Sequence, residues 1–213
     1  MSEVRKLQHP RFARAYLRIA EQAQQRGAIG HRQRLVAGMS GRVVEIGAGQ
    51  GLNFAYYPTS VSQVIAVEPD DTLRVHAERA AAHASIPVTV LAGQADQLPV
   101  DTDSCDGAVM SLVLCSVPDQ RSALLEVNRI LRPGGELRFY EHVRSESAWF
   151  ARLEDVATPL WSRLAGGCRP NRDTRAAIEQ AGFVIDDVER FGFSPQRLLP
   201  RSAHILGRAH TAT

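Results

Sequence analysis

Three glycines at every second position follow an apolar run in the first quarter of the chain. Residues 43–51 read VVEIGAGQG, with Glu45 ahead of Gly47, Gly49 and Gly51. Glycine lets a backbone turn tightly and approach a ligand closely. A second apolar run ends at Glu68, about 20 residues later, which is where a strand-end carboxylate meets a ribose diol in Rossmann-like sheets. The pattern predicts a strand, a glycine turn and a nucleoside-cofactor site.

The spacing of the glycines indicates which cofactor this is. A dinucleotide fingerprint places a third glycine where this chain has Leu52, and the polar Asn53 follows. Glu45 would repel a pyrophosphate but suits a ligand that carries an ammonium or a sulfonium group. S-adenosylmethionine (SAM) carries both, so SAM is the expected cofactor, and an NAD-dependent oxidoreductase is the disfavoured alternative.

Composition is typical of one α/β domain. The chain has 213 residues, 44% hydrophobic and 23% charged residues, and a net charge of +2, too small to indicate nucleic-acid binding. It has neither an apolar run of membrane-spanning length nor a signal-peptide core, so we expect a cytoplasmic protein. The basic residues among the first 42 form either a solvated helix face or a weak attraction to anionic lipid.

The three cysteines are Cys105, Cys115 and Cys168. They form no C-x-x-C pair, and so sparse a set argues against a disulfide framework or a zinc site. The sequence therefore predicts reduced thiols and no metal.

Helical and strand patterns alternate along the chain. Helices are expected over about 10–38, 51–58, 70–84, 119–131, 146–166 and 172–181. Strands are expected over about 42–47, 63–68, 88–91, 106–112, 136–142, 183–191 and 203–208. Such alternation predicts a parallel sheet with helices on both faces and its ligand at the carboxyl ends of the strands. We expect an N-terminal helical cap, residues 1–40, that covers the site of a single domain, residues 41–213.

Several motifs resemble those of the class I SAM-dependent methyltransferases. They are EIGAGQG at 45–51, EP at 68–69, GQADQLP at 93–99 and LRPGG at 131–135. More narrowly, SLVLCSV at 111–117, FYEHV at 139–143 and Gly167-Cys168 look like the animal alkyl-thiol S-methyltransferases, the methyltransferase-like 7 group. The resemblance implies a Rossmann-like, doubly wound sheet of seven strands in the order 3-2-1-4-5-7-6, with strand 7 antiparallel.

The same resemblance assigns cofactor contacts to residues of this chain. Around the glycine turn, beside the methionine part of SAM, they are Glu45, Gly47, Ala48, Gly49, Gly51 and Asn53. Glu68 would hold both ribose hydroxyls, with Pro69 and Leu73 packed on the nucleoside. Gln94 and Ala95 would meet the adenine edge, and Ser111 and Leu112 would form the wall beneath the sulfonium.

Methyl transfer from a sulfonium needs alignment more than acid–base help. His142 and Glu141, at the end of the strand expected over 136–142, are the candidate catalytic residues. His142 could accept a proton or hold a thiolate. Aromatic residues, among them Phe12, Tyr16 and Trp149, could close an apolar acceptor pocket.

The best single prediction of the acceptor is a small or lipophilic thiol. Transfer of the methyl group would convert SAM to S-adenosylhomocysteine. The alternative is an oxygen, nitrogen or carbon acceptor, such as a phospholipid headgroup or a quinone precursor. A SAM-binding protein without catalytic activity is a third possibility. Each reading gives the protein a small-molecule ligand.

Overall fold

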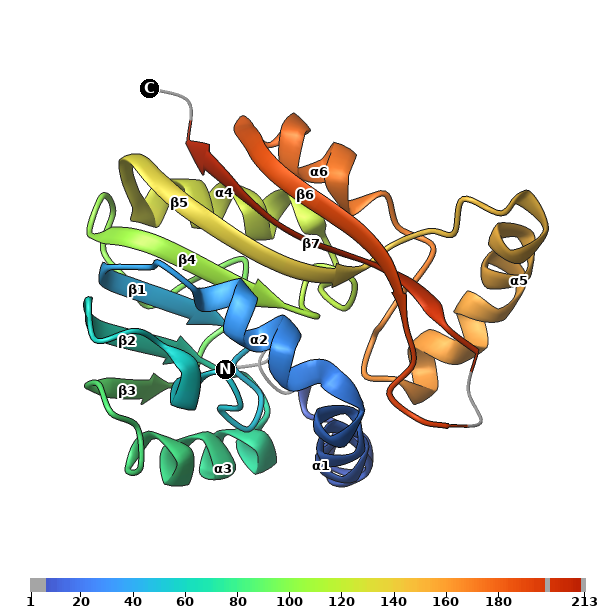
Figure 1. Cartoon of the computed structure of the whole chain (residues 1–213), viewed down its shortest axis with the longest axis horizontal. Helices are drawn as coiled ribbons and strands as arrows, with labels where there is room; N and C mark the ends of the chain where they lie inside the picture. The colour runs from blue at the N-terminus through green and yellow to red at the C-terminus, as the bar shows by residue number, and fades with distance from the viewer. Residues whose placement is uncertain (1–6, 198–199, 212–213) are drawn as a thin grey trace.

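The computed structural model describes residues 7–197 and 200–211. Seven strands form one sheet in the order β3-β2-β1-β4-β5-β7-β6, and β7 runs antiparallel to both neighbours. The strands are β1 (Gly41–Ile46), β2 (Val61–Val67), β3 (Val88–Leu91), β4 (Cys105–Ser111), β5 (Leu131–His142), β6 (Phe183–Phe193) and β7 (Ser202–Thr211). The strand order and the antiparallel seventh strand confirm the prediction (Figure 1).

The α-helices separate the strands as the sequence pattern predicts. They are α1 (Pro10–Ala23), α2 (Ile29–Val36), α3 (Asp71–Ala81), α4 (Gln120–Ile130), α5 (Ala148–Leu164) and α6 (Thr174–Gln180). A π-helical turn, Gln24–Ala28, joins α1 to α2, and Gly27 bends it with a φ of 109°. Figure 1 shows α2 in front of the sheet, α4 behind it, and α5 at one side. None of the helices described is long and apolar enough to span a bilayer.

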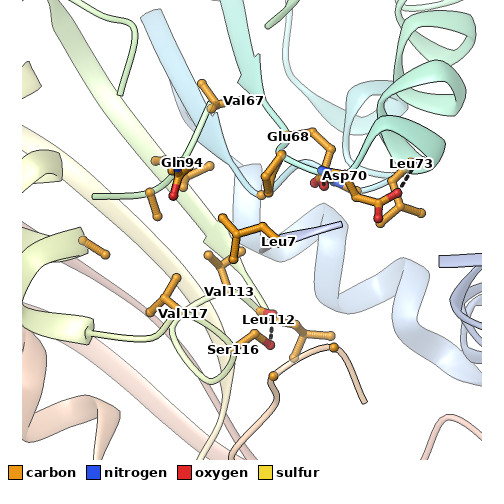
Figure 2. A pocket seen from close by; sticks show the side chains of 18 of the residues that line it. Leu7, Val67, Glu68, Asp70, Leu73, Gln94, Leu112, Val113, Ser116 and Val117 are labelled. Carbon is orange, nitrogen blue, oxygen red and sulfur yellow. Dashed lines mark hydrogen bonds between the residues drawn. The ribbon is translucent and has the colours of Figure 1, made fainter. Parts of the chain in front are cut away.

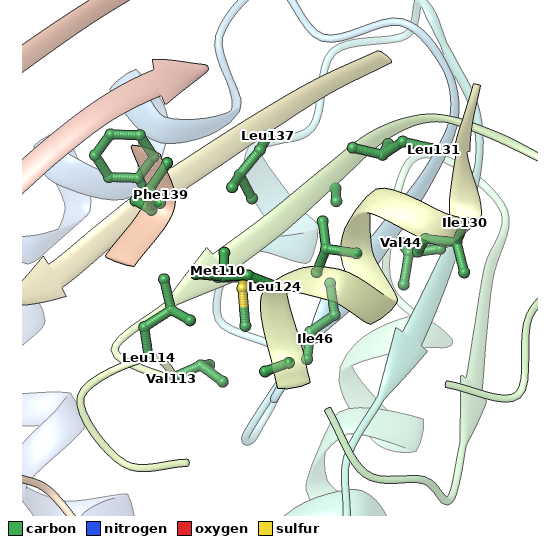
Figure 3. Close-up of a cluster of buried hydrophobic side chains, with 14 of the residues drawn as sticks. Val44, Ile46, Met110, Val113, Leu114, Leu124, Ile130, Leu131, Leu137 and Phe139 are labelled. Carbon is green, nitrogen blue, oxygen red and sulfur yellow. The ribbon is translucent and has the colours of Figure 1, made fainter. Parts of the chain in front are cut away.

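Two apolar layers sandwich the sheet because side chains alternate between the faces of a strand. Val44 and Ile46 of β1 pack on one face with Leu124 of α4, as Figure 3 shows. Val43 faces the other layer, together with Leu35 of α2. The second N-terminal helix is thus built into the core of the sheet, while the boundary at residue 40 stays a prediction.

The prediction of a helix over 51–58 is wrong. Only a 3-10 turn, Phe54–Tyr56, forms there. Tyr57 takes an extended backbone with ψ at 133°, as a residue before proline prefers, and Pro58 follows. Phe54 and Tyr57 are instead buried, Phe54 against Gly51 of the glycine turn and Tyr57 in a hydrogen bond to Glu45.

Candidate active site

The glycine turn follows β1 directly. Gly47, Gly49 and Gly51 have φ values of 63°, 59° and 79°, in the left-handed region that favours glycine. A Cβ on Gly47 would lie 2.6 Å from a methyl group of Val113, so no side chain fits between this turn and the loop after β4. Parallel pairing of β1 with β4 brings these two loops together.

Glu68 ties the glycine turn to the end of β2. One carboxylate oxygen accepts from the Gly49 backbone N–H at 2.8 Å, and the other accepts from the Asp70 N–H at 2.9 Å. The side chain is buried, and burial raises the pKa of Glu68 to about 7. The two bonds fix the carboxylate at the mouth of the turn, where the sequence predicts a ribose contact.

A cavity of about 400 Å³ opens at the carboxyl ends of β1, β2 and β4. Nine of the residues expected to contact the cofactor line it: Gly47, Gly49, Glu68, Pro69, Leu73, Gln94, Ala95, Ser111 and Leu112. Figure 2 shows Glu68, Asp70 and Leu73 on one side, Gln94 on a second, and Leu112, Val113, Ser116 and Val117 on a third. The cavity has the position that the doubly wound sheet predicts.

A smaller cavity adjoins the first, and both include Gly47, Tyr16 and Ser111. Three further predicted residues, Glu45, Ala48 and Asn53, line this smaller cavity. Asn53 donates to Glu45 at 2.9 Å, and Tyr57 donates to the other oxygen of Glu45 at 2.8 Å. Burial raises the pKa of Glu45 to about 7.

Arg32 of α2 also lines the smaller cavity, and no motif in the sequence indicates it. The buried guanidinium donates to Asn53 at 2.9 Å. Its Nε and the hydroxyl of Ser111 are buried without a hydrogen-bond partner among the described residues. Since buried polar groups are normally paired, these two donors fit the carboxylate of a bound amino-acid moiety, while Glu45 suits its ammonium. The residues present therefore fit the methionine part of SAM.

Gly51 lines neither cavity, so its cofactor contact stays a prediction. A Cβ there would lie 2.5 Å from the Phe54 ring and 2.9 Å from Ala80. Because Gly51 has no side chain, the turn packs closely against Phe54 and Ala80.

Glu141 does not line the cavity, and its catalytic role stays a prediction. Its buried carboxylate accepts three backbone N–H groups, from Val113 and Leu114 at 2.8 and 2.9 Å on one oxygen and from Cys115 at 3.1 Å on the other. Burial raises the pKa of Glu141 above its usual range. These bonds fix the loop after β4, where Leu112 holds a left-handed backbone with φ at 61°.

His142 also lies outside the lining of the cavity. Its ring packs against the ring of His204, with centroids 4.2 Å apart, and its Nδ1 lies 3.7 Å from the sulfurs of both Cys115 and Cys168. A catalytic role for His142 stays a prediction.

Residues 7–9 and helix α1 cover the cavity. The His9 N–H donates to Asp70 at 2.9 Å, and the Gln8 side chain donates to the Pro69 carbonyl at 2.7 Å. Leu7, Phe12 and Tyr16 complete the lining. The predicted N-terminal cover is confirmed, whereas Trp149 is 73% exposed and away from the cavity.

Comparisons with known proteins agree with this geometry. The methyltransferase domain family matches residues 44–139. Thiol S-methyltransferase TMT1B of Homo sapiens is 35% identical over 82% of this chain and 73% of that protein. Human thiol S-methyltransferase TMT1A is 37% identical over 69% of this chain and 62% of that protein.

Among solved structures, a SAM-dependent methyltransferase of Thermotoga maritima, described as a possible histamine N-methyltransferase, is 27% identical. The match has a TM-score of 0.70 and covers 94% of this chain and 97% of that one. The geometry of the cofactor site, the matching domain family and the relatives therefore all indicate a SAM-dependent methyltransferase. The chain belongs to the class I SAM-dependent methyltransferases, in the family that includes the thiol S-methyltransferases TMT1A and TMT1B.

Proposed function

We propose that this methyltransferase transfers the methyl group of SAM to the sulfur of a small or lipophilic thiol. The observation that carries the proposal is the match to thiol S-methyltransferase TMT1B, which is 35% identical over 82% of this chain. The cofactor itself supplies an activated methyl group on a sulfonium. The protein has to align the acceptor and exclude water.

The acceptor side of the cavity suits an apolar molecule. Phe12 and Tyr16 of α1 face this side together with Val113 and Val117 of the loop after β4. Arg169 supplies the one arginine among the described lining residues. A nearby cation favours a thiolate, which a thiol already forms to a few per cent at neutral pH.

The bond changes require little from the side chains. The acceptor sulfur loses its proton to solvent and attacks the methyl carbon in line with the departing sulfur. The carbon–sulfonium bond breaks, and its electron pair neutralises the leaving sulfur as S-adenosylhomocysteine. The fixed wall around Leu112 then serves to hold the methyl group in position, and the cover formed by Leu7 and Phe12 limits access of water.

Production of S-adenosylhomocysteine tests the proposal. Purified protein and SAM would be incubated with an alkyl thiol, with the alcohol and the amine of the same chain length, and with no acceptor. We expect turnover with the thiol only, and a methyl thioether that mass spectrometry identifies. Turnover with the alcohol or the amine but not with the thiol would refute the thiol assignment, while the assignment as a methyltransferase would stand.

A cytoplasmic location is likewise our proposal, supported by the composition of the chain. Fractionation of cells that express the full chain tests it, because a membrane-bound pool resistant to high salt would contradict it.

A further inference from the structure

Two thiols and an imidazole meet beside the cavity although they lie far apart in the sequence. Cys115 follows β4, His142 ends β5, and Cys168 follows α5. The two sulfurs lie 3.7 Å apart, and each lies 3.7 Å from Nδ1 of His142. Both cysteines are buried and the histidine is half-buried. Neither the glycine turn nor the cofactor contacts described above use this cluster.

The backbone holds the two cysteine loops in place. The Cys115 N–H donates to Glu141 at 3.1 Å, and its carbonyl accepts from the Arg169 N–H at 2.7 Å. The Cys168 N–H donates to the Ala165 carbonyl at 3.1 Å. Gly167 has a φ of 90°, and a Cβ there would lie 2.8 Å from the Ser116 carbonyl oxygen. The fold thus positions the sulfurs before any ligand arrives.

The spacing of the three donor atoms matches a tetrahedral zinc ion. Zinc bonds thiolate sulfur at about 2.3 Å and imidazole nitrogen at about 2.0–2.1 Å, so tetrahedral angles place two sulfurs about 3.8 Å apart and a sulfur and a nitrogen about 3.6 Å apart. All three separations observed are 3.7 Å. Soft thiolates and imidazole are also the donors that zinc prefers.

We propose that Cys115, His142 and Cys168 form a binding site for Zn²⁺. This assignment departs from the expectation of no metal, which looked for ligands close together in sequence. No fourth cysteine, histidine or carboxylate belongs to the group among the residues that the structure describes. Three protein ligands leave one coordination position for a ligand from outside.

The cluster adjoins the cavity through its neighbours in the chain. Ser116 follows Cys115 and Gly167 precedes Cys168, and both line the cavity. We infer that the open position takes the sulfur of the acceptor, a step that rests on the proposed thiol methylation. The thiol would lose its proton to solvent as the metal–sulfur bond forms, since only the thiolate is a ligand.

Cobalt(II) is the probe for the metal site because it replaces zinc and absorbs visible light. The full chain would be purified with a phosphine reductant, stripped with chelator and titrated with Co²⁺ in the presence of S-adenosylhomocysteine. We expect about one equivalent to bind, with a thiolate-to-cobalt charge-transfer band and the strong visible bands of tetrahedral cobalt. Zn²⁺ should displace the cobalt and abolish both signals.

Matched cysteine variants give the test its control. Cys115→Ala and Cys168→Ala should each lose the contribution of one sulfur to the charge-transfer band. Cys105→Ala removes a thiol from β4, outside the cluster, and should leave the band unchanged. Binding of S-adenosylhomocysteine reports whether each variant is folded. A folded protein that binds no cobalt, or a band of undiminished intensity in both cluster variants, would overturn the metal site.

Addition of the alkyl thiol to the cobalt protein tests the open position. A charge-transfer band that grows by the contribution of one further sulfur supports it, and an unchanged band at saturating thiol overturns it. Methyl transfer is assayed separately. Turnover at the same rate in a metal-free protein would refute the role of the metal in holding the acceptor alone, while cobalt binding without thiol turnover would refute the thiol function alone.

Discussion

Removal of the Glu68 carboxylate should weaken SAM binding in a pH-dependent manner. The carboxylate already accepts from two backbone N–H groups, at 2.8 and 2.9 Å, and it lines the cavity where the ribose is expected. Two charge-assisted hydrogen bonds to the ribose, each about 1.5–3 kcal/mol, are partly replaced by water after the change. A net loss of about 3 kcal/mol, or about a hundredfold in affinity, is expected for Glu68→Ala, and at least about tenfold.

The sign of the pH dependence follows from the raised pKa. Burial raises the pKa of Glu68 to about 7, so at lower pH the free protein holds this group protonated and has to release the proton to bind the ribose at full strength. Wild-type affinity should therefore fall about tenfold from pH about 8 to pH about 6 on account of this group. The effect of Glu68→Ala should shrink by the same factor over that range.

Calorimetric titration with S-adenosylhomocysteine at several pH values measures both effects. Glu78→Ala, an exposed position on α3, is the matched control, and we expect it to bind as the wild type does. Glu68→Asp keeps the charge and should fall between wild type and Glu68→Ala, which separates loss of the carboxylate from damage to the turn. An unchanged affinity in Glu68→Ala, or a loss that is the same at every pH, would refute the ribose assignment.

Three further outcomes are expected. Because burial raises the pKa of Glu45 and of Glu68 to about 7 from an ordinary value of 4.5, the cofactor-free protein should lose stability as pH rises through this window. The loss of unfolding free energy is on the order of 3 kcal/mol for each group. In urea denaturation, Glu45→Gln should flatten the dependence of unfolding free energy on pH. Arg32→Ala should weaken SAM binding at least about tenfold, since it removes a buried cation with a free donor, and unchanged calorimetric affinity would contradict this. Gly167→Ala should lower the free energy of unfolding more than Gly134→Ala does. Both positions have a positive φ, which costs about 1 kcal/mol of strain, but a Cβ at Gly134 meets no atom within 4 Å. Equal losses on thermal unfolding would count against the close loop contact.

Much of the sheet could be predicted from the sequence because β1, β2 and β4 are compact, largely apolar runs. Val88–Leu91 matches its predicted bounds, since Pro87 precedes it and a loop follows. β5 begins at Leu131, five residues before the predicted start, because Cys105 pairs with Leu131 ahead of the turn at Gly134. Local patterns do not report such pairing between distant strands.

Most of the cofactor site follows from motifs because its residues lie at the ends of consecutive strands. The motifs did not predict Arg32, since it reaches the site from an N-terminal helix that carries no motif. For Glu141, strand alternation alone does not show that its carboxylate binds backbone N–H groups of the loop after β4. The cluster of Cys115, His142 and Cys168 has no metal-ligand spacing in the sequence, since only the packing of three separate segments creates it.

The segment at residues 7–9 has a consequence for the catalytic cycle. Hydrogen bonds tie Gln8 and His9 to the start of α3, and Leu7 lies between the nucleoside side and the acceptor side of the cavity (Figure 2). We therefore expect these bonds to break before spent cofactor leaves past this segment. Exchange of product for fresh cofactor then includes an opening step separate from chemistry, so a first turnover faster than the steady state is the kinetic signature of this arrangement.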